Sequence, residues 1–225
     1  MNYFFFGLAF ALAVLDWVAV SRAWKKLEYF AKPATMVALL AFVIQNGGLS
    51  GEMVWFTLGL ALSLAGDVFL MLPKEQFIAG LVSFLLAHVA YIIGLEPRLP
   101  TALPAMLVAL ALAAVVALTA SQVYRRIAAG LRASGKTRLS GPVLIYTIVI
   151  SVMLFSAMLT LLSSKWFSLH AITVCLGAAL FFLSDAILAW NKFVSPLRNG
   201  RLMNMSTYHL GQMLIALGTA LHFLQ

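Results

Sequence analysis

Long apolar stretches, separated by short polar segments, repeat along the whole chain. About 20 helical residues cross a hydrocarbon core of about 30 Å, and most of the stretches have that length. This pattern predicts eight transmembrane helices, close to residues 3–21, 33–45, 52–72, 77–95, 101–120, 142–162, 167–190 and 205–225. No polar segment is long enough to form a second domain, so we expect a single transmembrane domain over residues 1–225.

The composition agrees with an all-α integral membrane protein. Of the 225 residues 63% are hydrophobic and 10% are charged, which lies outside the range of soluble proteins. The single cysteine, Cys175, excludes an intramolecular disulfide and a multi-cysteine metal site. The net charge of +8 comes from Lys and Arg residues in the gaps between apolar stretches, not along one stripe, so we expect no nucleic-acid partner.

The second stretch, 33–45, is short, and at 1.5 Å per residue it covers only about 20 Å. The positions of the basic residues nevertheless favour eight spans. With eight spans, every Lys and Arg except Arg98 and Lys165 lies on one side of the membrane, thirteen against two; without the second span the division is nine against six. The positive-inside rule therefore predicts both termini outside and a basic cytoplasmic loop at 121–141. In a bacterium this would place the protein in the inner, or plasma, membrane.

Three acidic residues fall inside the predicted spans: Asp16, Asp67 and Asp185. A charged side chain at membrane depth is costly unless it is paired or faces a wet cavity, so each is a candidate functional residue. Each lies five residues before the predicted inner end of its helix, and the three helices run in the same direction. We therefore expect the three carboxyls at one level, in a common cavity.

Further polar residues are expected to line or support this cavity. They are Lys32, Ser63, His88, Tyr91, Tyr146, Ser184, Tyr208 and Gln212. Gly59, Ser63 and Asp67 are spaced by four and share a helix face, which we expect to point inward. His88 lies near the membrane midplane, one turn from Tyr91, where the two would form a deeper wall. The alternative for each Asp and for His88 is a structural hydrogen bond to a neighbouring helix.

No metal or cofactor is expected. A catalytic zinc site takes about three protein ligands, and the sequence has neither an HExxH nor an HxxxH pair. Serine-hydrolase, ATP-binding and dinucleotide-binding motifs are also absent from the sequence.

Two segments suggest an internal repeat. Residues 66–70 (GDVFL) resemble residues 184–188 (SDAIL), and each is followed by a basic turn and a phenylalanine, Phe77 or Phe193. The two helices run in the same direction, as a parallel four-plus-four repeat requires.

The same two segments carry a resemblance to a known family. Residues 62–73 (LSLAGDVFLMLP) begin a pattern that continues through Phe77, Gly80, Leu81, Phe84, His88 and Tyr91, and a second pattern runs from 177–185 (GAALFFLSD) through Phe193 to 208–212, with Lys32-Pro33 earlier. These residues resemble the YhhN-like lysoplasmalogenase family, over essentially the whole chain. The resemblance implies a lysophospholipid substrate, whose vinyl ether bond is hydrolysed to give a fatty aldehyde and glycerophosphocholine or glycerophosphoethanolamine.

The chemistry of this bond suits buried carboxyls. Vinyl ethers resist hydroxide but are cleaved by acid, because protonation of the outer vinyl carbon gives an oxocarbenium ion that water captures. One carboxyl would donate the proton and a second would stabilise the cation, as in glycosidase pairs. We expect Asp67 and Asp185 to be this pair, in either order. Tyr208 or Tyr146 would position water, and Lys32 would bind the substrate phosphate or Asp16.

Two other functions fit the same features. Intramembrane aspartates, small-residue helix faces and a parallel repeat also describe a small proton-coupled transporter, although no helix has the central Gly/Pro break typical of a transport site. A noncatalytic lipid-binding protein is the third alternative. The head-group preference and the oligomeric state are left open by the sequence; the expected surroundings are membrane lipids.

Overall fold

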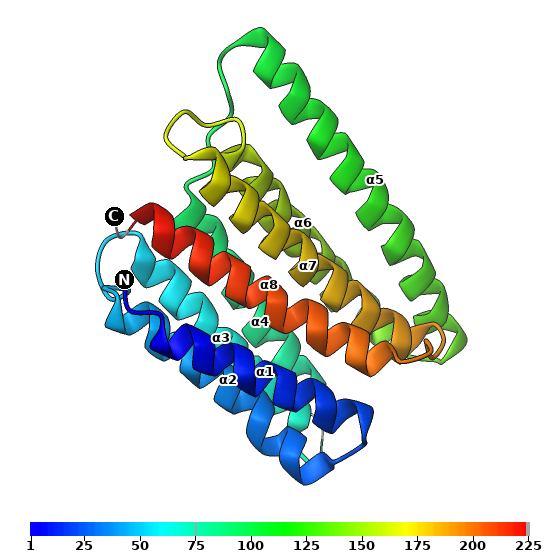
Figure 1. The fold of residues 1–225 in the computed structure, drawn as a ribbon. Helices are drawn as coiled ribbons and strands as arrows, with labels where there is room; N and C mark the ends of the chain where they lie inside the picture. The colour runs from blue at the N-terminus through cyan, green and yellow to red at the C-terminus, as the bar shows by residue number, and fades with distance from the viewer. Residues whose placement is uncertain (75, 224–225) are drawn as a thin grey trace.

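The computed structural model describes residues 1–74 and 76–223 and is a bundle of α-helices (Figure 1). The helices are α1 (Phe4–Ser21), α2 (Lys25–Gln45), α3 (Met53–Met71), α4 (Phe77–Leu95), α5 (Leu103–Ala133), α6 (Ser140–Thr160), α7 (Ser168–Phe193) and α8 (Gly200–Phe223), and a short 3-10 helix, η1 (Thr137–Leu139), precedes α6. These described residues form no β-strand. The prediction of eight helices in an all-α fold is therefore confirmed.

Seven helices in the described part of the chain, α1 to α7, are long and apolar enough to cross a membrane. The protein is thus a multi-pass integral membrane protein. Helix α8 has 24 residues but is more polar, and half of these residues are buried. It packs against α1, α2, α3 and α7, and a helix enclosed in this way can carry polar side chains away from lipid.

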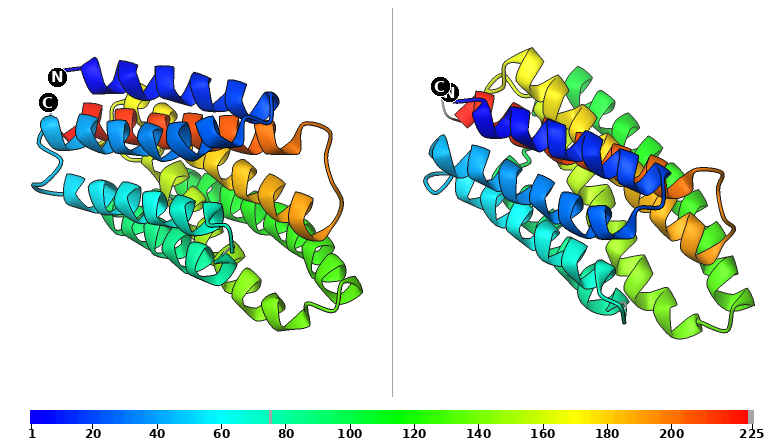
Figure 2. Two further views of the ribbon diagram at one scale, coloured as in Figure 1. Left: turned by 90° about the horizontal axis from the view of Figure 1, so that it is seen from below. Right: turned by 60° about the horizontal axis from the view of Figure 1, so that its bottom comes forward.

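Helices adjacent in sequence pack as antiparallel neighbours, with the exception of α4 and α5. The most extensive of these packings are α1 with α2, α3 with α4, and α7 with α8. Helix α5 lies at the edge of the bundle, beside α6 and α7 and away from α1 and α2 (Figures 1 and 2). Helix α1 begins and α8 ends at the same end of the bundle (Figure 2). We call the other end, which carries residues 22–26, 132–139 and 194–201, the basic end.

Helix α2 begins at Lys25, so the predicted start at residue 33 is wrong. Residues 25–32 are mostly good helix formers, and they extend α2 to 21 residues. Pro33 thus lies inside the helix, where it cannot donate a hydrogen bond to the carbonyl of Tyr29. Tyr29 lines a polar cavity described below, which is a place where an unpaired carbonyl can meet water.

The predicted loop at 121–141 is wrong for residues 121–133, which continue α5. Ile127 and Leu131 share a face of this extension and pack with Val143 and Phe193 at the ends of α6 and α7. The 31 residues of α5 span about 46 Å at 1.5 Å per residue, more than the hydrocarbon core. The length of the apolar run predicts only the part of a helix that lies in that core. Helix α8 similarly begins at Gly200, before the predicted residue 205.

Helices α7 and α8 cross closely at Gly177 and Gly211. A Cβ atom on Gly177 would lie 2.7 Å from the backbone nitrogen of Ile215 and 2.8 Å from the carbonyl oxygen of Gly211. Because these neighbours are backbone atoms, we expect Gly177→Ala to destabilise the protein by about 1–3 kcal/mol, measured as a lower thermal unfolding midpoint in detergent. Gly7→Ala is the control, since its Cβ would meet nothing within 4 Å. Equal effects of the two changes would contradict the close crossing.

Candidate active site

Asp67 of α3 is held by side chains from two other helices. The Lys32 Nζ atom of α2 lies 3.0 Å from its Oδ1 atom, and the Tyr208 hydroxyl of α8 donates a hydrogen bond of 2.7 Å to its Oδ2 atom. The side chains of Lys32 and Asp67 are 7% and 1% exposed. Both carboxylate oxygens therefore have a buried partner, as a charge enclosed by protein requires.

Asp185 of α7 has a different environment. The Tyr146 hydroxyl donates a hydrogen bond to Asp185 Oδ2, and His88 Nε2 lies 3.0 Å from the Tyr146 hydroxyl and 3.4 Å from the same carboxylate oxygen. The hydroxyl of the neighbouring Ser184 lies 3.4 Å from Asp185 Oδ1. The Asp185 side chain is 14% exposed, whereas His88 is fully buried. Asp185 is thus fixed from one side and open on the other.

Both aspartates line one cavity of about 390 Å³ towards the basic end of the bundle, which we call the polar cavity. Its lining consists of Lys25, Glu28, Tyr29, Lys32, Asp67, Leu70, Met71, Leu72, Pro73, Phe84, Ser184, Asp185, Leu188, Arg201, Asn204, Met205 and Tyr208. The structure therefore brings together five residues predicted for the site: Lys32, Asp67, Ser184, Asp185 and Tyr208. Carboxyls and cations from α2, α3, α7 and α8 face one space.

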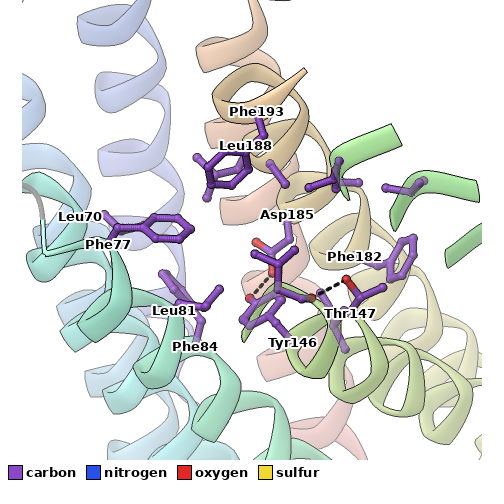
Figure 3. A pocket seen from close by; sticks show the side chains of 16 residues that line it. Leu70, Phe77, Leu81, Phe84, Tyr146, Thr147, Phe182, Asp185, Leu188 and Phe193 are labelled. Carbon is purple, nitrogen blue, oxygen red and sulfur yellow. Dashed lines mark hydrogen bonds between the residues drawn. The ribbon is translucent and has the colours of Figure 1, made fainter. Parts of the chain in front are cut away.

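A second, largely apolar pocket adjoins the polar cavity (Figure 3). Its lining consists of Leu70, Phe77, Leu81, Phe84, Val123, Ile127, Val143, Tyr146, Thr147, Ile150, Phe182, Asp185, Ala186, Leu188, Ala189 and Phe193. Leu70, Phe84, Asp185 and Leu188 belong to both linings. Asp185 carries the one carboxyl group in the apolar lining, and it lies where the two spaces meet.

The other predicted residues lie behind these walls. The Tyr91 hydroxyl donates a hydrogen bond of 2.6 Å to Gln212 Oε1, and both residues are buried. Ser63 is buried on the same face of α3 as Gly59 and Asp67, so the predicted inward face of that helix is confirmed. Neither Tyr91 nor Gln212 lines the polar cavity. They contribute to the packed polar interior beside it.

Asp16 is fully buried but is not part of the polar cavity lining. Its Oδ2 atom lies 3.9 Å from Nδ1 of His209, and that nitrogen accepts a hydrogen bond of 3.2 Å from the Trp17 indole. The cavity expected for three carboxyls is therefore lined by two of them, because α1 turns Asp16 towards His209. In residues 1–74 and 76–223, no group of three or more His, Cys, Asp or Glu side chains is placed to hold a metal ion.

Several polar residues of the cavity lining are not predicted from the sequence, among them Glu28, Arg201 and Asn204. Glu28 and Arg201 form an ion pair of 2.5 Å, and Asn204 donates a hydrogen bond of 2.7 Å to the backbone carbonyl of Ser184. All three fall in segments that were predicted to be loops. The spacing of Glu28 and Lys32, four residues apart, would have placed both on one face had α2 been extended to its true start.

Comparison with known proteins identifies relatives over most of the chain. The sequence profile of the YhhN family matches residues 27–219. Lysoplasmalogenase TMEM86B of Mus musculus is 30% identical over 216 residues, which cover 94% of this chain and 83% of that protein. A lysoplasmalogenase of Mycobacterium tuberculosis is 32% identical over 168 residues, which cover 72% of this chain and 58% of that protein. A lysoplasmalogenase homolog of Dictyostelium discoideum is 29% identical over 195 residues, which cover 73% of this chain and 62% of that protein. No solved structure matches the chain.

Proposed function

The chain belongs to the YhhN family, and from this premise we propose that it is an ether-bond hydrolase that cleaves the vinyl ether of lysoplasmalogens. The products are a fatty aldehyde and the glycerophospho-alcohol. Relatives that carry the name lysoplasmalogenase, from a mammal and from a mycobacterium, support the reaction class.

The position of Asp185 between the two spaces is the observation that carries this proposal. A lysoplasmalogen has one long apolar chain, a vinyl ether at the base of that chain and a charged head group. The apolar pocket suits the first part of the chain, and the polar cavity, with its cations, suits the head group. With the lipid placed in this way, the vinyl ether lies beside the Asp185 carboxyl.

Asp185 is the proton donor in the proposed mechanism. Its carboxyl protonates the outer vinyl carbon, and the resulting oxocarbenium ion is captured at the carbon that bears oxygen by a water molecule, which returns a proton to the carboxylate. The hemiacetal then collapses: the bond between this carbon and the glycerol oxygen breaks, and that oxygen takes up the hydroxyl proton. The Tyr146 hydroxyl donates a hydrogen bond to Asp185 and so fixes the orientation of the carboxyl. A positioned general acid contributes about 10²–10⁴-fold in rate.

Asp67 is the stabilising anion. Its two oxygens are bound to the Lys32 ammonium and the Tyr208 hydroxyl, so it is held as a carboxylate in a fixed orientation. A preorganised negative charge lowers the free energy of the cationic transition state more than water does, because it needs no reorganisation. The proposed roles of the two aspartates thus differ because their partners differ.

The test is aldehyde release by the purified protein in detergent. We expect aldehyde release from lysoplasmenylethanolamine. We expect none from the 1-acyl lysolipid, and none from the 1-alkyl lysolipid, because its saturated ether has no double bond to accept the proton. Release from the acyl lipid alone, as fatty acid, would indicate an esterase. No turnover of any of the three by folded protein would overturn the proposal.

The hydroxyl of Tyr146 is expected to matter for rate and not for folding. In Tyr146→Phe, the carboxylate that Asp185 becomes as it gives up its proton loses the hydroxyl donor of its Oδ2 atom. A hydrogen bond to a charged group is worth roughly tenfold. We therefore expect about a tenfold lower kcat in the aldehyde assay. Tyr124→Phe is the matched control, because the Tyr124 hydroxyl donates its hydrogen bond to the backbone carbonyl of Ser140 and Tyr124 lines neither the apolar pocket nor the polar cavity. Full activity of Tyr146→Phe would contradict the positioning role.

A further inference from the structure

The Glu28–Arg201 ion pair in the polar cavity has no role in the proposed proton transfer. Glu28 belongs to α2 and Arg201 to the first turn of α8, and the Glu28 Oε1 atom lies 2.5 Å from Arg201 Nη2. The two side chains are 12% and 63% exposed, respectively. The Glu28 carboxylate is therefore enclosed by the cavity wall, whereas most of the Arg201 side chain is exposed.

Six charged side chains line the polar cavity, and three of them already have a place in the proposed mechanism. Lys32 is paired with Asp67, and Asp185 also lines the apolar pocket. The remaining charged groups are Lys25, Glu28 and Arg201, two cations and one anion. Lys25 and Glu28 are three residues apart on α2, which brings their Cβ atoms about 5–6 Å apart on one face. This group therefore presents positive and negative charge within one helical turn.

An ethanolamine head group carries the complementary charges, a phosphate and an ammonium separated by two carbons. We propose that Glu28 binds the ammonium of the substrate head group and that Lys25 and Arg201 bind its phosphate. The ammonium takes the place of the Arg201 guanidinium on Glu28, and Arg201 turns to the phosphate, which it contacts through two parallel N–H groups. The enzyme then selects amine-bearing head groups over those that end in the phosphate. This inference rests on the proposed function for the class of substrate.

The experiment measures binding and so does not depend on turnover. Saturated 1-alkyl lysolipids with a phosphoethanolamine or a bare phosphate head are titrated onto the protein in nanodiscs, followed by intrinsic tryptophan fluorescence. We expect the parent to bind the phosphoethanolamine lipid about tenfold more tightly, and Glu28→Gln to abolish this preference. Glu96→Gln is the matched control, because it removes a carboxylate from the Glu96–Arg98 pair of 3.3 Å at the opposite end of the bundle; it should keep the preference.

Arg201→Gln separates recognition by Glu28 from an effect exerted through Arg201. If Glu28 binds the ammonium, Arg201→Gln weakens the binding of both lipids and keeps the preference. A loss of preference equal to that in Glu28→Gln would overturn the proposal, as would a parent without preference. If Glu28→Gln fails to fold, the double variant Glu28→Gln/Arg201→Gln removes both partners together and should likewise show no preference.

The same parent protein distinguishes the failure of this proposal from the failure of the proposed function. Preference in binding without aldehyde release from lysoplasmenylethanolamine would remove the proposed function and keep the head-group site. Aldehyde release without preference would remove the head-group site alone.

Discussion

The Asp185→Asn variant is expected to lose about 10³-fold in kcat for lysoplasmenylethanolamine, because an amide of the same shape has no acidic proton to give to the vinyl carbon. The change leaves the lining of both spaces and the Tyr146 hydroxyl in place, so we expect KM to change little. The measurement is steady-state aldehyde release by variants shown to be folded.

Asp16→Asn provides the comparison for this prediction. It also removes a buried carboxyl, but one that is absent from the polar cavity lining. We expect this variant to keep most of the kcat of the parent. Similar losses in the two variants would show that burial of a carboxyl, and not its place between the two spaces, decides activity.

The Lys32→Met variant is expected to have the largest effect on stability. Lys32 and Asp67 form a buried ion pair of 3.0 Å, and removing one partner of such a pair leaves an uncompensated buried charge, at a cost of about 3–5 kcal/mol. For a chain of this size we expect the thermal unfolding midpoint in detergent to fall by about 10 °C. Lys165→Met, which changes an exposed lysine, should shift the midpoint far less.

The double variant Lys32→Met/Asp67→Asn tests the reason for that loss. With both charges removed, no ion is left unpaired, so we expect the double variant to recover most of the lost stability while remaining inactive. A double variant as unstable as Lys32→Met would mean that Lys32 stabilises the bundle through packing and not through its charge.

The number of helices could be predicted from the sequence because the thickness of the membrane imposes the length of an apolar run. The residues at which the helices begin and end could not be predicted in this way. Residues 25–32 of α2, 121–133 of α5 and 200–204 of α8 continue their helices beyond the predicted apolar runs, and there the backbone follows helix propensity and contacts with neighbouring helices. Polarity alone makes such segments look like loops.

The candidate site could likewise be predicted only in part. Asp67 and Asp185 stand out in the sequence because a carboxyl inside an apolar run is costly, yet Asp16 stands out equally and faces His209 instead of the polar cavity. Only the rotation of each helix about its axis distinguishes the three, and that depends on packing. Glu28 and Arg201 lie in the helix ends that the apolar pattern misses, so their place in the cavity lining emerges only from the fold.

Protonation of carbon by a carboxylic acid is the central claim, and deuterium labelling tests it most directly. The purified protein is given lysoplasmenylethanolamine in D₂O, the aldehyde is reduced to its alcohol as it forms, and the configuration of the deuterated C2 carbon is determined by NMR of a chiral ester. If a carboxyl fixed in the active site protonates the outer vinyl carbon, the deuterium enters from one face, so C2 has a single configuration, and turnover is slower than in H₂O. A racemic C2, as expected for an enol that is released before it takes up its proton, would contradict the mechanism.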